Sequence, residues 1–228
     1  MASLPSPLPE SPILRAPALI RDQVADYLRD TITSLQLPAG APLVEREICA
    51  VTTASRATVR EALRQLQSEG LVESEPGRGT FVKTFTRKEV EDMYAIRAQL
   101  EGLACRLFVR NRSTEQLEAL REAVEAMAHA VDDPTLMLKE KTRFYAVLFA
   151  GAGNSELTRI LQGLRRRITL VQANSLAVPG RPAQSLAEIQ GIVAAIEDGD
   201  GPRAEKLCVE HIQAAATTLL SSPEARFL

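Results

Sequence analysis

The first third of the sequence carries apolar residues at helical spacing, interrupted by short polar or glycine-rich turns. The spacing predicts a helix over 19–35, a short helix over 45–51 and a third helix over 56–69. Gly70 follows the last apolar position of the third helix, where a left-handed residue commonly ends a helix. These positions predict three short helices, of which the second and third are joined by a tight polar turn.

The pattern changes from helical to strand-like after this third helix. Residues 71–73 and 80–82 are short strand candidates, and the segment 76–79 between them contains two glycines and a proline. This combination predicts a hairpin with a glycine-rich tip. Helix, helix, turn, helix and hairpin is the order of a winged helix-turn-helix, which we therefore predict for residues 15–83.

The rest of the sequence is predicted to be helical after a short polar connection over 84–88. Capping sequences and apolar stripes mark six helices. Their approximate extents are 90–107, 114–131, 134–151, 155–168, 185–196 and 202–220. Residues 173–183, with two prolines, are expected to form the longest irregular stretch. The predicted fold class is mainly α, with an all-helical bundle over 89–222.

The first 14 residues are rich in proline and lack the basic and apolar regions of a signal peptide. We expect this segment to be a disordered tail. No run of apolar residues approaches the roughly 18 of a membrane span. Together these features predict a soluble, cytoplasmic protein.

Charge and cysteine content narrow the possible functions. The net charge is −2, and residues 15–83 carry nine basic and nine acidic residues, so net charge alone gives no support for DNA binding. The three cysteines form no CxxC pair, which argues against a disulfide framework or a zinc ribbon. Neither a Ser/His/Asp set, a P-loop nor a GxGxxG motif is present, so an enzyme is disfavoured.

The third predicted helix has the chemistry of a DNA-recognition helix. Arg56, Thr58 and Arg60 lie early in it and avoid its apolar stripe. An arginine there can bind guanine O6 and N7, or a phosphate, with two hydrogen bonds. Ser55 is the predicted N-cap, beside N–H groups that suit a phosphate. Gly77 at the hairpin tip allows close approach of the backbone to DNA.

Four segments in the same order resemble the GntR-type transcription regulators, in the branch named after the fatty-acid regulator FadR. They are 37–48, 55–63, 69–72 and 77–82, which resemble the family's "PG..L.ER.LA", "SR.PVREAL", "EGLV" and "GxG.FV" motifs. The resemblance implies DNA contacts by a set of residues in the helix-turn-helix and the wing. These are Arg46, Ser55, Arg56, Thr58, Arg60, Gly77 and Arg78.

The helical half resembles the ligand-binding domain of the same branch, called FCD. Arg97 with Glu101, Phe144 with Gly153-Asn154, Glu188, and Gly199-Asp200 lie where that domain has its characteristic residues. In that family an Asp and three His often hold a divalent metal. Here the corresponding positions are Lys141, Tyr145, Ile189 and His211. One imidazole cannot hold a transition metal without partners, so we expect no metal cofactor.

Helical periodicity places these four positions and Arg97 on inward faces. Arg97 and Lys141 could bind a carboxylate, with hydrogen bonds from Tyr145 and His211. We therefore predict a small anionic effector at Arg97, Lys141, Tyr145, Ile189 and His211. The alternatives are that Lys141 reaches solvent, that Glu101 fully occupies Arg97, and that His211 is an ordinary core residue. The run 165–167 is interpreted as one solvated and one interfacial helix face.

These observations predict a homodimeric transcription regulator, expected to be a repressor, that binds a palindromic operator and is controlled by the effector. The alternative is a constitutive or architectural winged-helix protein whose helical domain only dimerises. A polar-lined cavity enclosed by the helical core would favour the first function.

Overall fold

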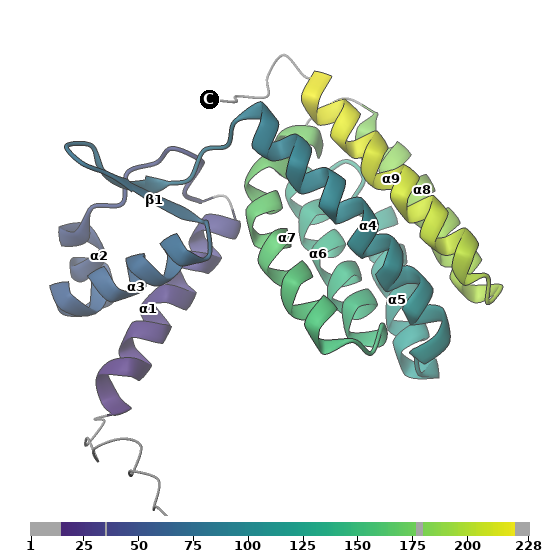
Figure 1. Cartoon of the computed structure of the whole chain (residues 1–228), viewed down its shortest axis with the longest axis horizontal. Helices are drawn as coiled ribbons and strands as arrows, with labels where there is room; N and C mark the ends of the chain where they lie inside the picture. Colours follow the sequence, from purple (N-terminus) through teal and green to yellow (C-terminus); the bar gives the residue numbers. More distant parts are fainter. Residues whose placement is uncertain (1–14, 35, 177–179, 222–228) are drawn as a thin grey trace, which may run out of the picture. The chain divides into compact units, whose positions relative to one another are not determined.

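The computed structural model describes residues 15–34, 36–176 and 180–221 (Figure 1). The predicted tail over 1–14 lies outside these ranges. The chain divides into two compact units between Lys83 and Thr84, and each is described by itself.

The first unit contains three helices and one hairpin within the described residues. They are α1 (Arg15–Thr33), α2 (Glu45–Thr52), α3 (Arg56–Ser68), β1 (Val72–Glu75) and β2 (Gly79–Val82). α3 packs against both α1 and α2. The apolar stripe predicted for α3 is buried at Val59, Leu63 and Leu66, and it shares the core with Leu28 and Ile32 of α1. Burial of these stripes fixes which face of α3 stays exposed.

The hairpin is an antiparallel pair in which Val72 lies opposite Val82 and Glu75 opposite Gly79. Gly77 at its tip has a φ of +82°, in the left-handed region that glycine adopts without strain. A feature not predicted from the sequence is an isolated bridge between Pro42 and Phe81, which extends the pairing of β2 on its other edge. The predicted winged helix-turn-helix is confirmed.

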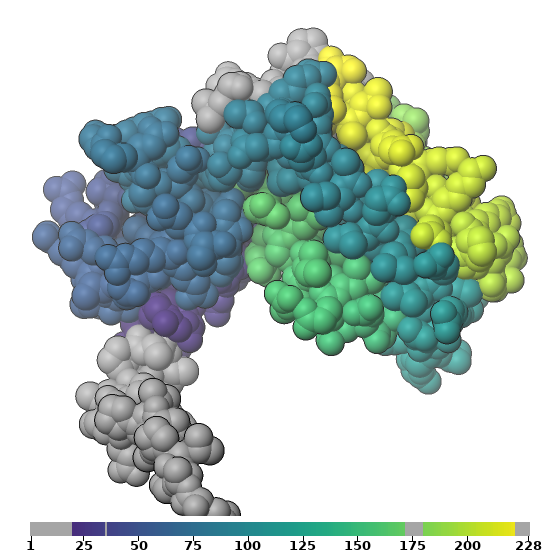
Figure 2. Space-filling model, viewed as in Figure 1, coloured from purple at the N-terminus to yellow at the C-terminus, as the bar shows by residue number. Residues whose placement is uncertain are grey.

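The second unit is entirely helical within the described residues. Its helices are α4 (Arg87–Asn111), α5 (Thr114–Ala128), α6 (Pro134–Gly151), α7 (Ser155–Leu176), α8 (Arg181–Glu197) and α9 (Gly201–Ser221). α4 is central, because it packs against α6, α7, α8 and α9. Figure 2 shows α4 (teal) and α9 (yellow) side by side, covering the interior of the unit on that face. The predicted helical bundle is confirmed.

The connection between the units is shorter than the predicted 84–88. α4 already begins at Arg87, because Thr86 and Glu89 form a capping box: each side chain bonds the other residue's backbone N–H. The sequence signal for this box is the Thr-x-x-Glu spacing.

The irregular stretch expected over 173–183 is also largely helical. α7 continues to Leu176 and α8 begins at Arg181. Pro182 lies in the first turn of α8, where its missing N–H would have had no intrahelical acceptor. Proline there starts the helix, so reading it as a loop signal was wrong. No helix in the described ranges is long and apolar enough to cross a membrane.

Candidate functional site

The N-terminus of α3 is organised by Ser55. Its Oγ accepts a hydrogen bond from the backbone N–H of Thr58 (3.1 Å) and lies 2.8 Å from the Thr58 hydroxyl oxygen. The sequence prediction that Ser55 is the N-cap is confirmed. The N–H groups of Arg56 and Ala57 belong to the first turn and have no intrahelical acceptor. They therefore suit an external anion such as a phosphate.

The arginines predicted to contact DNA are all exposed, but they differ in their partners. Arg46 and Arg56 make no ion pair or side-chain hydrogen bond with any described residue. Arg60 binds Glu45 of α2 through its Nε (2.9 Å). Arg56 is thus free of ion pairs among the described residues, whereas Arg60 could bind an external anion only by giving up Glu45.

Arg78, beside the tip of the wing, is also engaged. Its Nη1 lies 3.3 Å from a carboxylate oxygen of Glu75, and its guanidinium carbon lies 4.1 Å from the centre of the Phe81 ring. Gly77 is exposed beside it. Arg64, one turn beyond Arg60, pairs with Glu61 at 2.6 Å. The exposed face thus comprises the start of α3, the start of α2 and the wing.

The second unit contains a group of buried charged and polar side chains from α4, α6, α7, α8 and α9, here called the polar cluster. Its members are Arg97, Glu101, Lys141, Tyr145, Arg165, Arg181, Ser185, Glu188 and His211. All are buried except Glu188, which is 21% exposed. Burying a charged group costs free energy unless it has an ion-pair or hydrogen-bond partner. The buried atoms that lack such a partner therefore indicate where the cluster could bind a ligand.

One end of the polar cluster is built around Arg97. Its Nε donates to Glu101 (2.8 Å) and its Nη2 donates to the Tyr145 hydroxyl (3.1 Å), while Nη1 is buried and has no partner. Arg165 lies over the Tyr145 ring, 3.9 Å from its centre. Both Nη atoms of Arg165 are buried without a hydrogen bond, and Nη1 is 3.7 Å from Glu101. This end therefore presents unpartnered donors from two arginines.

The other end is an ordered chain of ionic groups. Arg181 binds both carboxylate oxygens of Glu188, at 2.8 and 2.9 Å. Glu188 also contacts Nδ1 of His211. Burial alone would raise the pKa of Glu188, but the hydrogen bonds from His211 and Arg181 outweigh it and lower the pKa to about 2. The carboxylate is therefore ionised at neutral pH.

Lys141 lies between these groups. Its Nζ donates to Ser185 Oγ at 2.7 Å, and the residue is only 2% exposed. Burial, and then the charges of Arg97, Arg165 and Arg181, hold the Lys141 pKa well below its usual value. The alternative that Lys141 reaches solvent is therefore wrong. An anion beside it would restore the charged form.

The predicted effector residues are brought together in part. Arg97, Lys141, Tyr145 and His211 all belong to the polar cluster. Ile189 is fully buried on α8, where its apolar side chain can contribute only van der Waals contacts to a ligand. The alternative that Glu101 fully occupies Arg97 is also wrong, because one guanidinium nitrogen remains unpartnered.

Sequence analysis missed Arg165, Arg181 and Ser185. The interpretation of 165–167 as a solvated and an interfacial face fails at Arg165, which is buried against Tyr145. A signal was present: Arg165 is four residues after Leu161 and three before Ile168, and so lies in their apolar stripe. Arg181 and Ser185 likewise lie eight and four residues before Ile189.

The side chains present do not fit a divalent metal. No group of three or more His, Cys, Asp or Glu side chains in metal-binding arrangement occurs among the described residues. Glu188 is already shared between Arg181 and His211. The charge of Arg97 also acts on His211, which opposes binding of a cation there.

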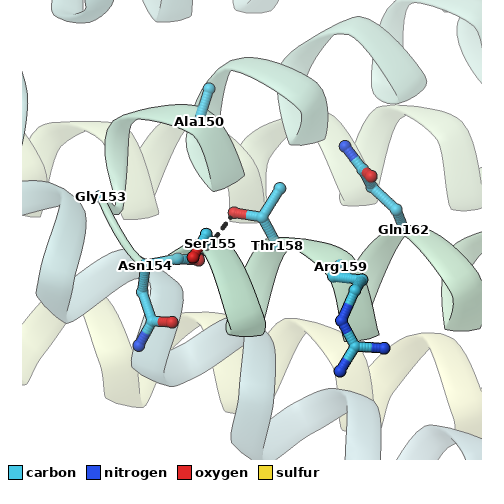
Figure 3. Close-up of a pocket in the computed structure, with 7 residues that line it drawn as sticks. All are labelled: Ala150, Gly153, Asn154, Ser155, Thr158, Arg159 and Gln162. Carbon is cyan, nitrogen blue, oxygen red and sulfur yellow. Dashed lines mark hydrogen bonds between the residues drawn. The ribbon is translucent and has the colours of Figure 1, made fainter. Parts of the chain in front are cut away.

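An open pocket of about 410 Å³ at the turn between α6 and α7 is a separate candidate (Figure 3). It is lined by Ala150, Gly153, Asn154, Ser155, Thr158, Arg159 and Gln162. Asn154 is occupied as the cap of α7, accepting from the N–H of Leu157, and exposed Arg159 pairs with Glu156. None of these residues belongs to the polar cluster. We therefore do not assign the effector to this pocket.

Comparison with known proteins gives two family matches that cover the two units. Residues 20–82 match the bacterial regulatory proteins of the gntR family, and residues 92–214 match the FCD domain. A probable D-xylose utilization operon transcriptional repressor of Paenarthrobacter nicotinovorans is 33% identical, over 86% of each chain. The HTH-type transcriptional repressor RspR of Escherichia coli K12 is 24% identical over 85% of this chain and 86% of its own.

A solved structure agrees with these matches. A putative GntR transcriptional regulator from Rhodococcus sp. RHA1 superposes with a TM-score of 0.78 at 25% identity, covering 89% of this chain and 98% of its own. The families and relatives are regulators and not enzymes. This chain belongs to the GntR family of bacterial transcription regulators, with a winged helix-turn-helix followed by an FCD domain.

Proposed function

We propose that this chain is a homodimeric repressor whose binding to a palindromic operator is controlled by a small organic anion held, without a metal, in the polar cluster. The observation that carries the effector assignment is the set of buried, unpartnered nitrogens on Arg97 and Arg165. An unmade hydrogen bond from a buried group costs free energy. A carboxylate oxygen is the partner that two guanidinium groups favour most.

The balance of charge in the polar cluster supports an anion. Arg97, Arg165 and Arg181 are opposed by only Glu101 and Glu188, before Lys141 is considered. The Lys141 ammonium is disfavoured while the cluster is empty of other anions. A bound carboxylate removes this penalty, so ligand binding should stabilise the folded chain by mass action.

The proposed DNA contacts are Arg46, Ser55, Arg56, Thr58, Arg60, Gly77 and Arg78. Six of them are exposed and Thr58 is half-buried, and all seven lie near the starts of α2 and α3 or at the wing, which supports this assignment. A two-fold dimer would place two copies of α3 on two half-sites of a palindrome. The names of the Paenarthrobacter and E. coli relatives support repression.

The first test is a thermal-shift screen of the full chain with small organic acids, followed by DNA-binding assays with each hit. We expect a stabilising carboxylate that changes operator affinity. Arg165→Met and Lys141→Met should abolish the thermal shift while leaving DNA affinity in the absence of ligand unchanged. Arg167→Met, on the same turn of α7 but outside the polar cluster, is the matched control and should retain the shift.

Three results would contradict the proposal. Retention of the ligand response in both cluster variants would place the effector elsewhere. Stoichiometric transition metal in protein purified without chelator, measured by elemental analysis, would contradict a metal-free site. Sedimentation of the full chain as a monomer at micromolar concentration would contradict the dimer.

A further inference from the structure

We propose that the effector is a hydroxy acid: its carboxylate binds the unpartnered nitrogens of Arg97 and Arg165, and its hydroxyl donates a hydrogen bond to Nε2 of His211. This inference rests on the proposed function, because it takes the polar cluster to be the effector site. It goes further by specifying a second chemical group that the effector must carry.

The first step is the position of the proton on His211. Both oxygens of Glu188 are held by Arg181, and one of them also contacts Nδ1 of His211. A carboxylate in a two-point ion pair with arginine is an acceptor only. Nδ1 must therefore carry a proton and donate it to Glu188. The imidazole is then charged if Nε2 also carries a proton and neutral if it does not.

The second step is that the ring is neutral. Burial lowers the pKa of His211 to about 3; the hydrogen bond to Glu188 opposes this shift, and the charge of Lys141 adds to it. The ionisable groups that act on the ring are Glu188 on α8, Lys141 on α6 and Arg97 on α4. The other ionisable groups of the polar cluster are Glu101 on α4, Tyr145 on α6, Arg165 on α7 and Arg181 on α8. A neutral imidazole protonated at Nδ1 has a bare lone pair at Nε2.

The third step is that this lone pair has no partner. His211 Nε2 is buried and makes no hydrogen bond with any described residue. Glu101 Oε2 is a second buried acceptor that makes no hydrogen bond with any described residue. The polar cluster therefore offers unsatisfied donors, on Arg97 and Arg165, together with unsatisfied acceptors.

The fourth step compares the ligands that could satisfy both sets. A simple carboxylate brings acceptors only, so it pairs with the arginines and leaves Nε2 unsatisfied. An ammonium group donates, but it adds positive charge where Arg97, Arg165 and Arg181 already exceed the two glutamates. A hydroxyl donates without adding charge. A carboxylate joined to one or more hydroxyls is therefore the complementary ligand.

The protonation state of His211 can be tested without any ligand. The chain has two histidines, so His129→Gln leaves His211 as the only imidazole in protein labelled with 15N-histidine. Ring 15N chemical shifts distinguish a protonated from a bare nitrogen. At neutral pH we expect Nδ1 to be protonated and Nε2 bare. A proton on Nε2 would overturn the inference while leaving carboxylate binding unaffected.

The effector class is tested with matched acids that differ by hydroxylation: glycolate and acetate, lactate and propionate, malate and succinate, gluconate and hexanoate. Affinities for the full chain are measured by calorimetry. In each pair that binds, we expect the hydroxylated acid to bind about tenfold more tightly or better, since a hydrogen bond to a buried acceptor is gained. Equal affinities within pairs would overturn this inference and leave the proposed function standing. Failure of all eight acids to bind would count against both.

Two variants separate the hydroxyl subsite from the carboxylate subsite. His211→Phe removes the acceptor and should reduce the ratio of affinities within a pair to about one, while carboxylate binding persists. Glu188→Gln presents an amide donor to Nδ1, so the imidazole proton should move to Nε2. The 15N chemical shifts of the two ring nitrogens should then exchange, and the preference for the hydroxylated acid should be lost. Glu205→Gln, a carboxyl on α9 outside the polar cluster, should keep the ratio. An unchanged ratio in both cluster variants would overturn the proposal.

Discussion

Two arginines whose guanidinium nitrogens make no hydrogen bond with any described residue, Arg56 in the first unit and Arg165 in the second, lie in opposite surroundings. Arg56 lies exposed at the start of α3, where water can satisfy its guanidinium. Arg165 is buried over Tyr145, and both of its Nη atoms lack hydrogen bonds. The exposed group costs the fold little, whereas the buried nitrogens without hydrogen bonds cost it free energy.

This difference implies that substitutions should separate stability from binding in the first unit and couple them in the second. An exposed arginine can be removed with loss of binding alone. A charge in the polar cluster is part of a balance among several buried groups, so its loss affects the folded state directly. The following predictions test this distinction, in order of decreasing size.

The largest effect is expected for Glu101→Gln. Glu101 is fully buried, bonds Arg97 at 2.8 Å and lies 3.7 Å from Arg165, so its loss leaves two buried cations without a compensating charge. We expect the free energy of unfolding to fall by about 3 kcal/mol or more. Chemical denaturation at neutral pH measures this.

The matched control for this variant is an exposed ion pair between the same two kinds of side chain. Arg106 and Glu205 lie 3.1 Å apart and link α4 to α9, with 49% and 31% of their side chains exposed. Glu205→Gln should cost about 1 kcal/mol or less. Equal losses in the two variants would contradict the distinction between buried and exposed charge.

Arg56→Ala should weaken operator binding by about 1–3 kcal/mol if the side chain binds a base with two hydrogen bonds. The free energy of unfolding should stay unchanged, because Arg56 contacts no described side chain that depends on it. Fluorescence anisotropy with labelled operator and a parallel denaturation curve give both quantities. Arg159 is an exposed arginine on α7, so Arg159→Ala controls for the general loss of a positive charge. Unaltered DNA affinity in Arg56→Ala would contradict the assignment of α3 as the recognition helix.

Stability should also depend on pH through His211. Its folded-state pKa is lowered from 6.5 to about 3, so the unfolded chain binds more protons than the folded chain between these values. The free energy of unfolding should therefore fall as pH is lowered below 6.5, by up to about 1.4 kcal/mol per pH unit. Between pH 6.5 and 5 Glu188 does not contribute, because the stability from its lowered pKa is lost only below about pH 4.5.

Denaturation curves between pH 6.5 and 5 measure the dependence. His211→Phe should flatten it, whereas His129→Gln, at the end of α5, should leave it intact. The same slope in all three proteins would mean that another group is responsible.

The smallest effect is expected at the cap of α3. Ser55→Ala removes the hydrogen bond to the Thr58 N–H and should cost about 1 kcal/mol of stability. Ser55→Asp should restore the cap but place a negative charge beside the proposed phosphate site. We therefore expect Ser55→Asp to fold normally and to bind operator more weakly than Ser55→Ala does. The opposite order of affinities would exclude phosphate binding at this helix start.

The sequence predicted correctly those residues whose role depends only on nearby positions in the chain. Gly70 has a positive φ after the end of α3, and Ser55 caps α3, each as the pattern indicated. These features depend on neighbours within a few positions in the chain. The order of helices and hairpin followed from them, together with the apolar spacing.

The polar cluster was only partly predictable, because its contacts join residues far apart in the sequence. Glu188, which Arg181 binds, contacts His211 from another helix, and Lys141 donates to Ser185. Arg165 was misassigned because a run of three arginines resembles a solvated face, although its position follows an apolar stripe. The interpretation relied on the charge of the three arginines and not on the helical spacing of Arg165. The burial of Arg165 shows that the spacing was the better indicator of its position.

The aromatic residues of the chain have a practical consequence for spectroscopy. The sequence has no tryptophan and three tyrosines, of which Tyr94 and Tyr145 are buried and Tyr27 is 46% exposed. The Arg97 guanidinium lies 5.2 and 5.5 Å from the two buried rings, and Arg165 lies 3.9 Å from that of Tyr145. Near-ultraviolet absorbance and emission therefore originate largely beside the proposed effector site. In a Tyr27→Phe protein, unlabelled optical titration would report directly on the surroundings of these two arginines.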